Sequence, residues 1–181
     1  VVDVDYCTVN GHPFFCTCGV GFDAFISWKF SEAGKRGLVT YMKEAFQNWA
    51  GYSPVCYEIE TDDGVHLRQT AVLITCANAA QWGNNARIAP HASLTDGLLD
   101  VTVVDPLNVL QAGPVAVHLM GGTLHWSPLT KMFKCRSLII RRPEEGPAHF
   151  DGEPMMLGTE LEVKVIPEGL KMLVPARKKN I

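Results

Sequence analysis

The chain has 181 residues, which is the length of one compact domain. Hydrophobic residues make up 47% and charged residues 19%, so the composition is that of a folded globular protein rather than a disordered one. The 16 Lys and Arg against 19 Asp and Glu give a net charge of −3, which argues against a nucleic-acid-binding protein. No apolar run has the roughly 18 residues that a membrane-spanning helix needs, and no segment has the pattern of a secretory signal.

The six cysteines are scattered and form no Cys-x-x-Cys pair, which argues against a zinc site. We expect reduced, buried thiols and therefore a cytoplasmic protein. Because Val1 already lies inside an alternating apolar stretch, we also expect the chain to be a piece of a longer protein. The cysteines are Cys7, Cys16, Cys18, Cys56, Cys76 and Cys135.

The first residues of the chain predict a β-hairpin followed by a helix. Apolar and polar residues alternate along residues 2–8, which is the pattern of a strand. Asn10-Gly11 predicts a hairpin turn, because both positions of such a turn need positive φ. We expect residues 12–18 to form the partner strand, Gly19-Val20-Gly21 to break it, and Gly21-Phe22-Asp23-Ala24 to lead into a helical stretch.

The clearest helical pattern covers residues 38–50. Apolar side chains recur there every three or four residues and form one stripe, while polar side chains occupy the other faces. We expect the stripe to face the core, although an aromatic stripe also suits a lipid or a partner protein. Gly51 is a plausible stop. The stripe consists of Leu38, Tyr41, Met42, Ala45, Phe46 and Trp49.

Strand patterns dominate from residue 54 onward. Hairpin turns outnumber crossover helices, so the sequence predicts a mainly β protein, a two-layer antiparallel β-sandwich with one or two helices. Asp105-Pro106 is expected to open a short helix that Gly113-Pro114 interrupts. The predicted strands are 55–61, 65–77, 98–104, 133–142, 161–166 and 170–174, with a turn at Asp62-Asp63-Gly64 and a turn-rich segment at 78–97.

The turn-rich segment is the first candidate site, because so long a loop inside a compact domain is usually functional. Asp96-Gly97 near its end places a carboxylate on a tight turn that enters a strand. Turn carbonyls beside one carboxylate offer the hard oxygen ligands that Mg²⁺ prefers. The alternative is that Asp96 only caps the turn by accepting nearby backbone N–H groups.

The second candidate site is the segment His149-Phe150-Asp151-Gly152-Glu153-Pro154, where two carboxylates flank a glycine between two strands. This spacing allows a general base, or a base together with a group oriented toward a metal. The alternative is that Asp151-Gly152 simply supplies a hairpin turn.

Taken together, these segments resemble the C-terminal half of the diacylglycerol kinase-like lipid kinases, a family that includes sphingosine and ceramide kinases and bacterial lipid kinases. The resemblance covers nearly the whole chain, and the motifs agree in order and spacing. They are Cys18-Gly19-Val20-Gly21-Phe22-Asp23-Ala24, Asn78, Pro90, Ala92, Asp96-Gly97-Leu98-Leu99-Asp100-Val101 and Asp151-Gly152-Glu153.

The resemblance implies that residues 1–181 form a single lipid-substrate-binding β-sandwich domain, like the second domain of NAD kinases. The family's N-terminal α/β domain binds ATP through a Gly-Gly-Asp-Gly-Thr motif, and the reaction moves the γ-phosphoryl group of ATP to a lipid hydroxyl such as that of diacylglycerol. This sequence contains neither that motif nor a P-loop, so we expect the ATP-binding domain to be missing from the chain and the piece alone to be inactive.

The resemblance also implies roles for individual residues. Glu153 would be the proton acceptor, and Asp151 would support Glu153 or the metal. A structural Mg²⁺ would be held by Asp96 with backbone oxygens of Ser93 and Leu98. The family's long loop usually carries a run of glycines, whereas this chain has Trp82-Gly83-Asn84, which changes the loop geometry.

A lipid substrate implies contact with a membrane surface, so we expect a cytoplasmic protein that is peripheral to the membrane. Basic clusters attract anionic lipids, although runs of charge are more often a solvated face. The sequence leaves open whether the protein forms a homodimer.

Two alternatives to a lipid kinase remain: a non-catalytic lipid-binding or regulatory module, and a kinase for a soluble alcohol related to NAD kinase. The basic residues are Lys131, Lys134, Arg136, Arg141, Arg142 and Arg177-Lys178-Lys179, and the histidines without ligand spacing are His91, His118, His125 and His149.

Overall fold

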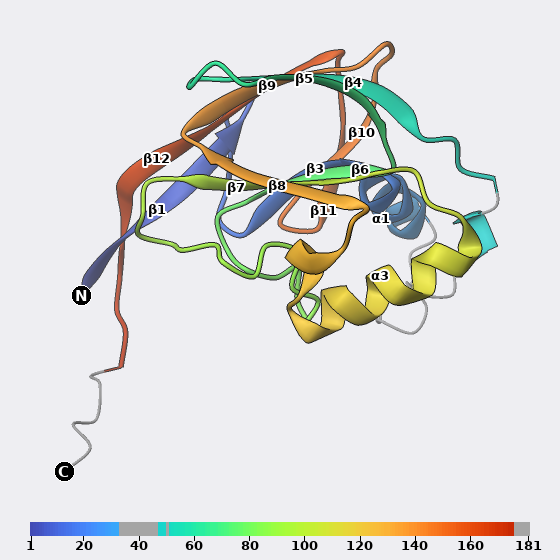
Figure 1. The fold of residues 1–181 in the computed structure, drawn as a ribbon. Helices are drawn as coiled ribbons and strands as arrows, with labels where there is room; N and C mark the ends of the chain where they lie inside the picture. Colours follow the sequence, from blue (N-terminus) through green and yellow to red (C-terminus); the bar gives the residue numbers. More distant parts are fainter. Residues whose placement is uncertain (33–46, 50, 176–181) are drawn as a thin grey trace.

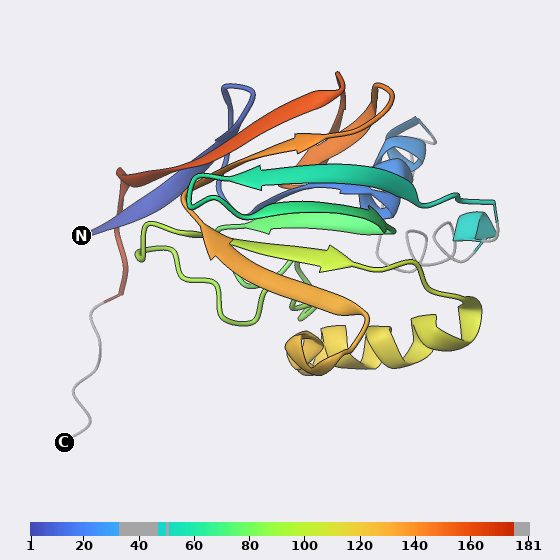
Figure 2. The ribbon, with the colours of Figure 1, turned by 45° about the horizontal axis from the view of Figure 1, so that its top comes forward.

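A computed structural model describes residues 1–32, 47–49 and 51–175. Two six-stranded antiparallel sheets lie face to face, which confirms the predicted sandwich (Figures 1 and 2). The first sheet has the order β2 (His12–Phe14), β1 (Val2–Val9), β12 (Glu160–Met172), β9 (Ser137–Arg141), β4 (Val55–Thr61) and β5 (His66–Ala71). The second has the order β11 (Glu153–Leu157), β10 (Gly146–Phe150), β3 (Thr17–Gly21), β6 (Leu73–Ala77), β7 (Leu99–Val104) and β8 (Thr130–Cys135).

A third layer of helices and loop covers the outer face of the second sheet. It contains α1 (Phe22–Glu32), α3 (Val109–Gly121), the 3-10 turn η1 (Leu124–Trp126) and the loop 78–98. Figures 1 and 2 both show α3 below β7 and β8, on the side away from the first sheet.

The main core lies between the two sheets, and a second apolar cluster lies between the second sheet and the outer layer. Strand β6 serves both: Ile74 and Cys76 belong to the main core, whereas Leu73 and Ala77 belong to the second cluster. A strand buried on both faces has an unbroken apolar run rather than an alternating one.

Three predicted strands were wrong in the same way, because the chain passes from one sheet to the other within each. Residues 12–18 divide between β2 and β3, residues 65–77 divide at Val72 between β5 and β6, and residues 133–142 divide at Arg136 between β8 and β9. Each segment keeps the pattern of a strand through the change of sheet, although residues 66–71 are much more polar than the buried residues 73–77. In contrast, the predicted strands 161–166 and 170–174 form the single strand β12.

The predicted break at Gly19-Val20-Gly21 was also wrong, because β3 continues to Gly21. Gly21 is needed for a different reason. Its φ is +109°, and a Cβ there would lie 2.4 Å from the carbonyl oxygen of Val72. The expected helical stretch follows, and α1 begins at Phe22.

Helix α3 begins three residues later than the predicted start at Pro106, and Pro114 lies inside it rather than ending it. Asn108 caps the helix by accepting from the Gln111 amide, while the Gln111 side chain accepts from the Asn108 amide. Gly122 closes the other end with φ +68°. The caps at both ends determine where α3 begins and ends, so its bounds differ from the predicted ones. The predicted helix 38–50 lies largely outside the described residues, of which 47–49 are helical.

All six cysteines are free thiols, as predicted. Four are buried, but Cys16 and Cys56 are exposed, so the expectation of uniform burial was wrong for these two. Within the described ranges, no helix has the length and apolar character needed to cross a bilayer.

Candidate functional site

Asp151 anchors the hairpin β10–β11 to the crossover between β2 and β3. Its carboxylate accepts from the backbone amides of Phe15 (2.7 Å), Cys16 (2.7 Å) and Thr17 (3.0 Å). Its own amide donates to the carbonyl of Thr17 at 2.8 Å. Asp151 adopts φ +51°, a conformation that Asp tolerates better than most residues. The carboxylate therefore holds a chain crossing in place.

Asn78 binds the same crossover from the other side. Its Nδ2 donates to the carbonyl of Phe15 at 3.0 Å and to that of Asp5 at 3.0 Å. The amides of Asn78 and Ala79 both donate to the carbonyl of Cys16, at 2.9 and 3.0 Å. Asn78 is fully buried, and its Oδ1 has no partner among the described residues. The loop 78–98 thus starts from a fixed point beside the Asp151 hairpin.

Asp5 holds the other end of the loop 78–98 close to Asn78 and the Asp151 hairpin, and we call this region the Asp5 corner. The sequence did not predict this role of Asp5. It is buried, and its carboxylate accepts from the amides of Gly97 and Glu168, each at 2.8 Å. Its amide donates to the carbonyl of Leu94 at 2.7 Å. The pairing of β1 with β12 shifts register between Val4 and Tyr6, which is where Asp5 lies. In the sequence Asp5 is one polar residue of an alternating strand, and its partners are backbone groups, so no side-chain signal identifies it.

Glu153 stands free at this corner. It is exposed, begins β11 and pairs with Phe150 across the hairpin turn. In the part of the chain that the structure describes, no group forms a hydrogen bond or ion pair with its carboxylate. The two acids of the Asp151-Gly152-Glu153 motif therefore have different environments: one holds the backbone and the other faces solvent.

Asp96 makes the turn-capping contact that was weighed against metal binding. Its Oδ1 accepts from the Leu98 amide at 3.1 Å, and its Oδ2 lies 2.9 Å from Nζ of Lys134. Lys134 also donates to Asp100 at 2.7 Å. Ser93 contacts Thr95 through its hydroxyl at 3.4 Å.

The side chain of Lys134 competes with the magnesium ion predicted at Asp96. The ammonium group of Lys134 already lies between the carboxylates of Asp96 and Asp100. Burial raises the pKa of Asp100, while the hydrogen bonds to Asp100 and Asp96 outweigh the opposing effect of burial and raise the pKa of Lys134. Within the described ranges no cluster of three or more His, Cys, Asp or Glu is arranged to hold a metal, but the predicted set of one carboxylate and two backbone oxygens is of another kind and stays a prediction. We therefore assign no catalytic step to an ion here.

His149 of β10 and Asp23 of α1 form a buried pair, which the sequence analysis did not predict. Nε2 of His149 is 2.8 Å from Oδ2 of Asp23, and both side chains are almost fully buried. Gly19 makes room for the pair, because a Cβ there would lie 2.7 Å from Asp23 Oδ2 and 2.9 Å from His149 Nε2. His149 was expected to be an ordinary core or surface histidine, and its partner is 126 residues away in the sequence.

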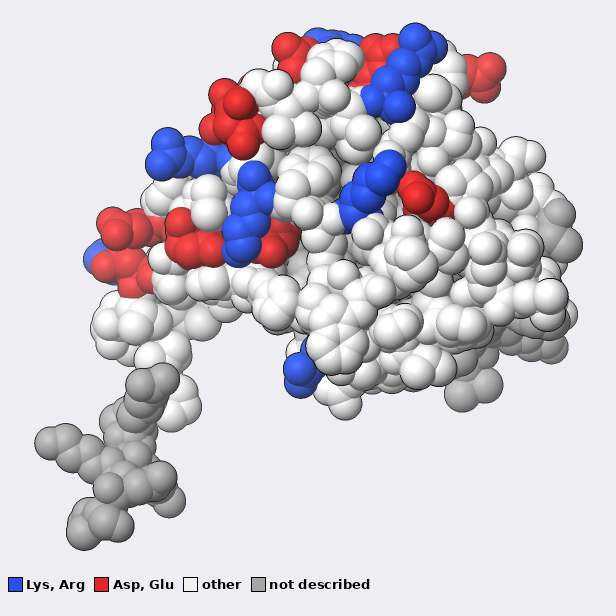
Figure 3. Space-filling model, viewed as in Figure 1, with Lys and Arg blue, Asp and Glu red and all other residues white. Residues whose placement is uncertain are grey.

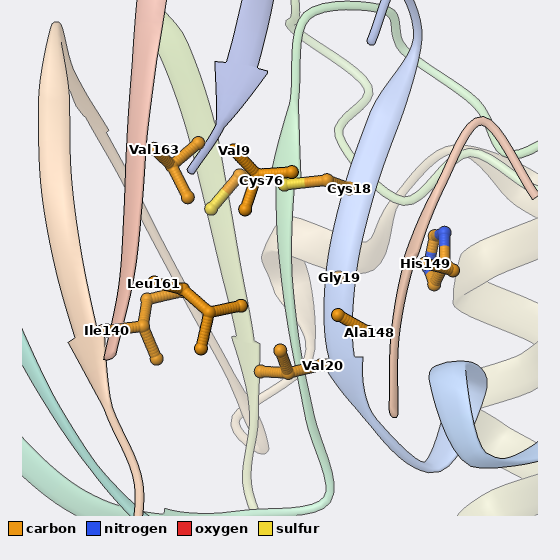
Figure 4. Close-up of a pocket in the computed structure, with 10 residues that line it drawn as sticks. All are labelled: Val9, Cys18, Gly19, Val20, Cys76, Ile140, Ala148, His149, Leu161 and Val163. Atoms are coloured by element: carbon orange, nitrogen blue, oxygen red, sulfur yellow. The ribbon is translucent and has the colours of Figure 1, made fainter. Parts of the chain in front are cut away.

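The small space between the sheets is not the site. Figure 4 shows aliphatic side chains and thiols around it, with Leu161 and Val163 from one sheet facing Cys18 and Cys76 from the other. His149 is also among the residues that line this space, but its ring pairs with Asp23, whereas Ala148 belongs to the main core. An apolar space of this kind is part of the packing.

The sandwich, and the corner where the loop 78–98 meets the Asp151 hairpin, define the class of domain. A family profile described as "YegS C-terminal NAD kinase beta sandwich-like domain" matches residues 17–174. This chain belongs to that family, which confirms the resemblance drawn from the sequence motifs.

Individual proteins are also similar to this chain. The chain is 25% identical over 174 residues to "Probable lipid kinase YegS-like" of Shewanella frigidimarina, covering 95% of this chain and 55% of that protein. It is 30% identical over 183 residues to "Uncharacterized protein sll0036" of Synechocystis, covering 97% and 41%. It also superposes on a crystal structure of a diacylglycerol kinase from Bacillus anthracis with a TM-score of 0.62 and 18% identity, covering 92% and 52%. The chain thus spans about half the length of the relatives it matches.

Proposed function

We propose that this chain is the acceptor-binding half of an ATP-dependent lipid kinase, which transfers the γ-phosphoryl group to a hydroxyl of diacylglycerol or a similar lipid alcohol. One observation carries the proposal: the free carboxylate of Glu153 projects from a hairpin that Asp151 ties to the backbone through three amides. A general base has to be both accessible and fixed in position, and this arrangement provides both.

In the proposed reaction the acceptor oxygen forms a bond to the γ-phosphorus and the bond from that phosphorus to the bridging oxygen of ADP breaks. The hydroxyl proton passes to the carboxylate of Glu153. Phosphoryl transfer needs mainly positioning and charge stabilisation, and ATP brings Mg²⁺ on its own phosphates. Asp151 acts as a positioning residue for Glu153, and the ATP site lies in the part of the protein that the relatives carry beyond this chain. We place the reaction on the cytoplasmic side of a membrane, where ATP is available.

The test is phosphate transfer from ATP and Mg²⁺ to a panel of lipid alcohols by the full-length protein that contains this chain. Glu153→Gln removes the proton acceptor at nearly constant volume, and we expect kcat to fall about 10²- to 10⁴-fold with the thermal midpoint unchanged. Glu144→Gln is the matched control, since Glu144 is also an exposed carboxylate. A full rate in Glu153→Gln would remove this residue from the mechanism. Absence of transfer by the unaltered protein, with lipid binding retained, would favour a non-catalytic lipid-binding module. Transfer only to soluble alcohols would favour a kinase of the NAD kinase type.

A further inference from the structure

Helix α3 presents an apolar side to solvent. None of its residues is buried, and Leu110 and Val117 are 87% and 72% exposed. Trp126, in the adjoining turn η1, is 70% exposed. We define the outer face of α3 as Val109, Leu110, Pro114, Val117, Met120 and Trp126.

The fold does not need these outward side chains. The helix is held by its inner side, where Val115 and Leu119 pack against the second apolar cluster. Both of its ends are capped. A contiguous exposed apolar surface that contributes nothing to the core marks a binding surface.

The chain around this face carries no charge. Residues 106–130 contain no Asp, Glu, Lys or Arg. Figure 3 shows that charged side chains gather at the top and left of the molecule, whereas the lower right, where Figure 1 places α3, is almost uniformly uncharged. A surface without charge suits the hydrocarbon boundary of a bilayer.

One cation lies at the edge of the face. Arg87 is exposed, its side chain packs against Gly122, and its amide donates to the carbonyl of Leu119 at 3.0 Å. Among the described residues no carboxylate forms an ion pair with it. An arginine beside an apolar face is placed to meet an anionic lipid head group.

Three of the basic residues expected to bind a membrane are engaged elsewhere. Lys134 pairs with two aspartates, and Arg141 pairs with Glu60 and Glu160. Arg142 is buried and donates to four backbone carbonyls. These residues therefore do not form a free cationic patch. The segment Arg177-Lys178-Lys179 lies outside the described residues.

We propose that the outer face of α3 is the surface by which the protein docks on a lipid bilayer, with Trp126 at the water boundary and Arg87 against anionic head groups. Tryptophan is enriched at that boundary because its ring is both apolar and polar. The choice of a bilayer as the occupant rests on the proposed function, since a lipid acceptor has to be taken from one.

The loop 78–98 links the docking face to the candidate site. The loop 78–98 starts at Asn78 and ends beside Gly97, which are both held at the Asp5 corner. Its middle packs on α3 and η1, where the rings of His91 and His125 are 4.6 Å apart. One loop thus connects the bilayer surface to the corner that carries Glu153.

The test measures binding of the full-length protein to vesicles of phosphatidylcholine and phosphatidylglycerol that contain neither diacylglycerol nor ATP. The double variant Leu110→Gln/Val117→Gln should partition into vesicles about tenfold or more weakly. Leu173→Gln is the matched control, because Leu173 is 84% exposed but lies beyond the end of β12. Arg87→Gln should weaken binding to vesicles with phosphatidylglycerol and leave binding to pure phosphatidylcholine unchanged.

Quenching by brominated lipids gives an independent readout. It should fall in Trp126→Phe relative to the unaltered protein. Equal vesicle binding by the unaltered protein and the double variant would overturn the proposal. Conversion of a dimer to a monomer by the double variant, with vesicle binding retained, would reassign the face to self-association. Neither readout requires phosphate transfer, so failure of the proposed kinase activity is distinguishable. If that activity is present, the double variant should lose it on vesicles and keep it on a short-chain, water-soluble diacylglycerol.

Discussion

Asn78 and Asp151 bind opposite edges of the same peptide segment: Asn78 donates to the carbonyl of Phe15, and Asp151 accepts from the amide of Phe15. The start of the long loop and the turn of the hairpin β10–β11 are thereby fixed relative to each other, although 73 residues separate them in the sequence. Movement of the loop would have to break one of these contacts. The free carboxylate of Glu153 is therefore presented by a rigid frame rather than by a mobile loop.

Replacement of Asp151 tests this anchoring role. We expect Asp151→Ala to lower the free energy of unfolding by about 1.5–3 kcal/mol, because three backbone amides lose a charged acceptor. Asp151→Asn should cost less, since the amide oxygen still accepts and Asn tolerates positive φ. Urea denaturation measures both. Equal stability of Asp151→Ala and the unaltered protein would show that water replaces the carboxylate at no cost.

Replacement of Gly19 tests the buried pair His149–Asp23. A methyl group at Gly19 would overlap Asp23 Oδ2 and His149 Nε2, so we expect Gly19→Ala to destabilise the protein by about 1–3 kcal/mol. Gly158→Ala is the control. Gly158 lies outside the strands with nothing within 4 Å of the added methyl, and its replacement should change the stability by less than about 0.5 kcal/mol. Thermal unfolding should therefore shift for Gly19→Ala only, and equal shifts for both variants would contradict the reasoning.

Replacement of Lys134 tests whether its ammonium group takes the place of a cation. We expect millimolar Mg²⁺ to leave the thermal midpoint of the unaltered protein unchanged. Lys134→Met leaves Asp96 and Asp100 without their shared partner, and Mg²⁺ should then stabilise this variant. Lys131→Met is the control, because Lys131 lies on the same strand and pairs with Asp105. Stabilisation of the unaltered protein by Mg²⁺, lost in Asp96→Asn, would restore the metal site predicted from the sequence.

The buried thiols predict a loss of stability at alkaline pH. Burial raises the pKa of Cys7 and Cys135 far above the ordinary value of 9.0. Above pH 9 the unfolded chain releases protons that the folded state keeps, so stability is full below this pH and falls as the pH rises. Each thiol contributes a slope of about 1.4 kcal/mol per pH unit. Urea denaturation between pH 8 and roughly 10.5 should show a shallower slope for Cys135→Ala than for the unaltered protein. Identical slopes would contradict the prediction.

The fold class could be predicted because strand periodicity and turn chemistry are local. Asn10 and Gly11 have φ of +47° and +82°, as the predicted hairpin requires. The strand from Val55 to Thr61 alternates as expected. The change of sheet at Val72 was missed because both sides of it have strand patterns, although the residues change there from the mixed stretch 66–71 to the buried run 73–77. The predicted interruption of the helix at Pro114 was wrong, because the caps and the packing of α3 outweigh the helix-breaking tendency of a single proline.

The site was predicted only where its residues form a short motif. The segment Asp151-Gly152-Glu153 forms a hairpin turn as its spacing suggested, but the binding of Asp151 to amides of Phe15 and Cys16 depends on a chain crossing that no local pattern encodes. Asp5 and the pair His149–Asp23 were missed because their partners are remote in sequence. For Lys134 the charge was visible in the sequence, but its position between two aspartates depends on the register of β7 with β8.

The pairing of β1 with β12 places Val2 opposite Met172. During synthesis, the first strand therefore emerges from the ribosome long before its neighbour in the sheet exists. The hairpins β4–β5 and β10–β11 join nearby residues, but the first sheet closes only after almost all of residues 2–172 have been made. Contacts of such long sequence separation slow folding. The exposed edge of β1 is then open to pairing with other chains in the interval, so expression at low temperature or with chaperones should raise the yield of folded protein.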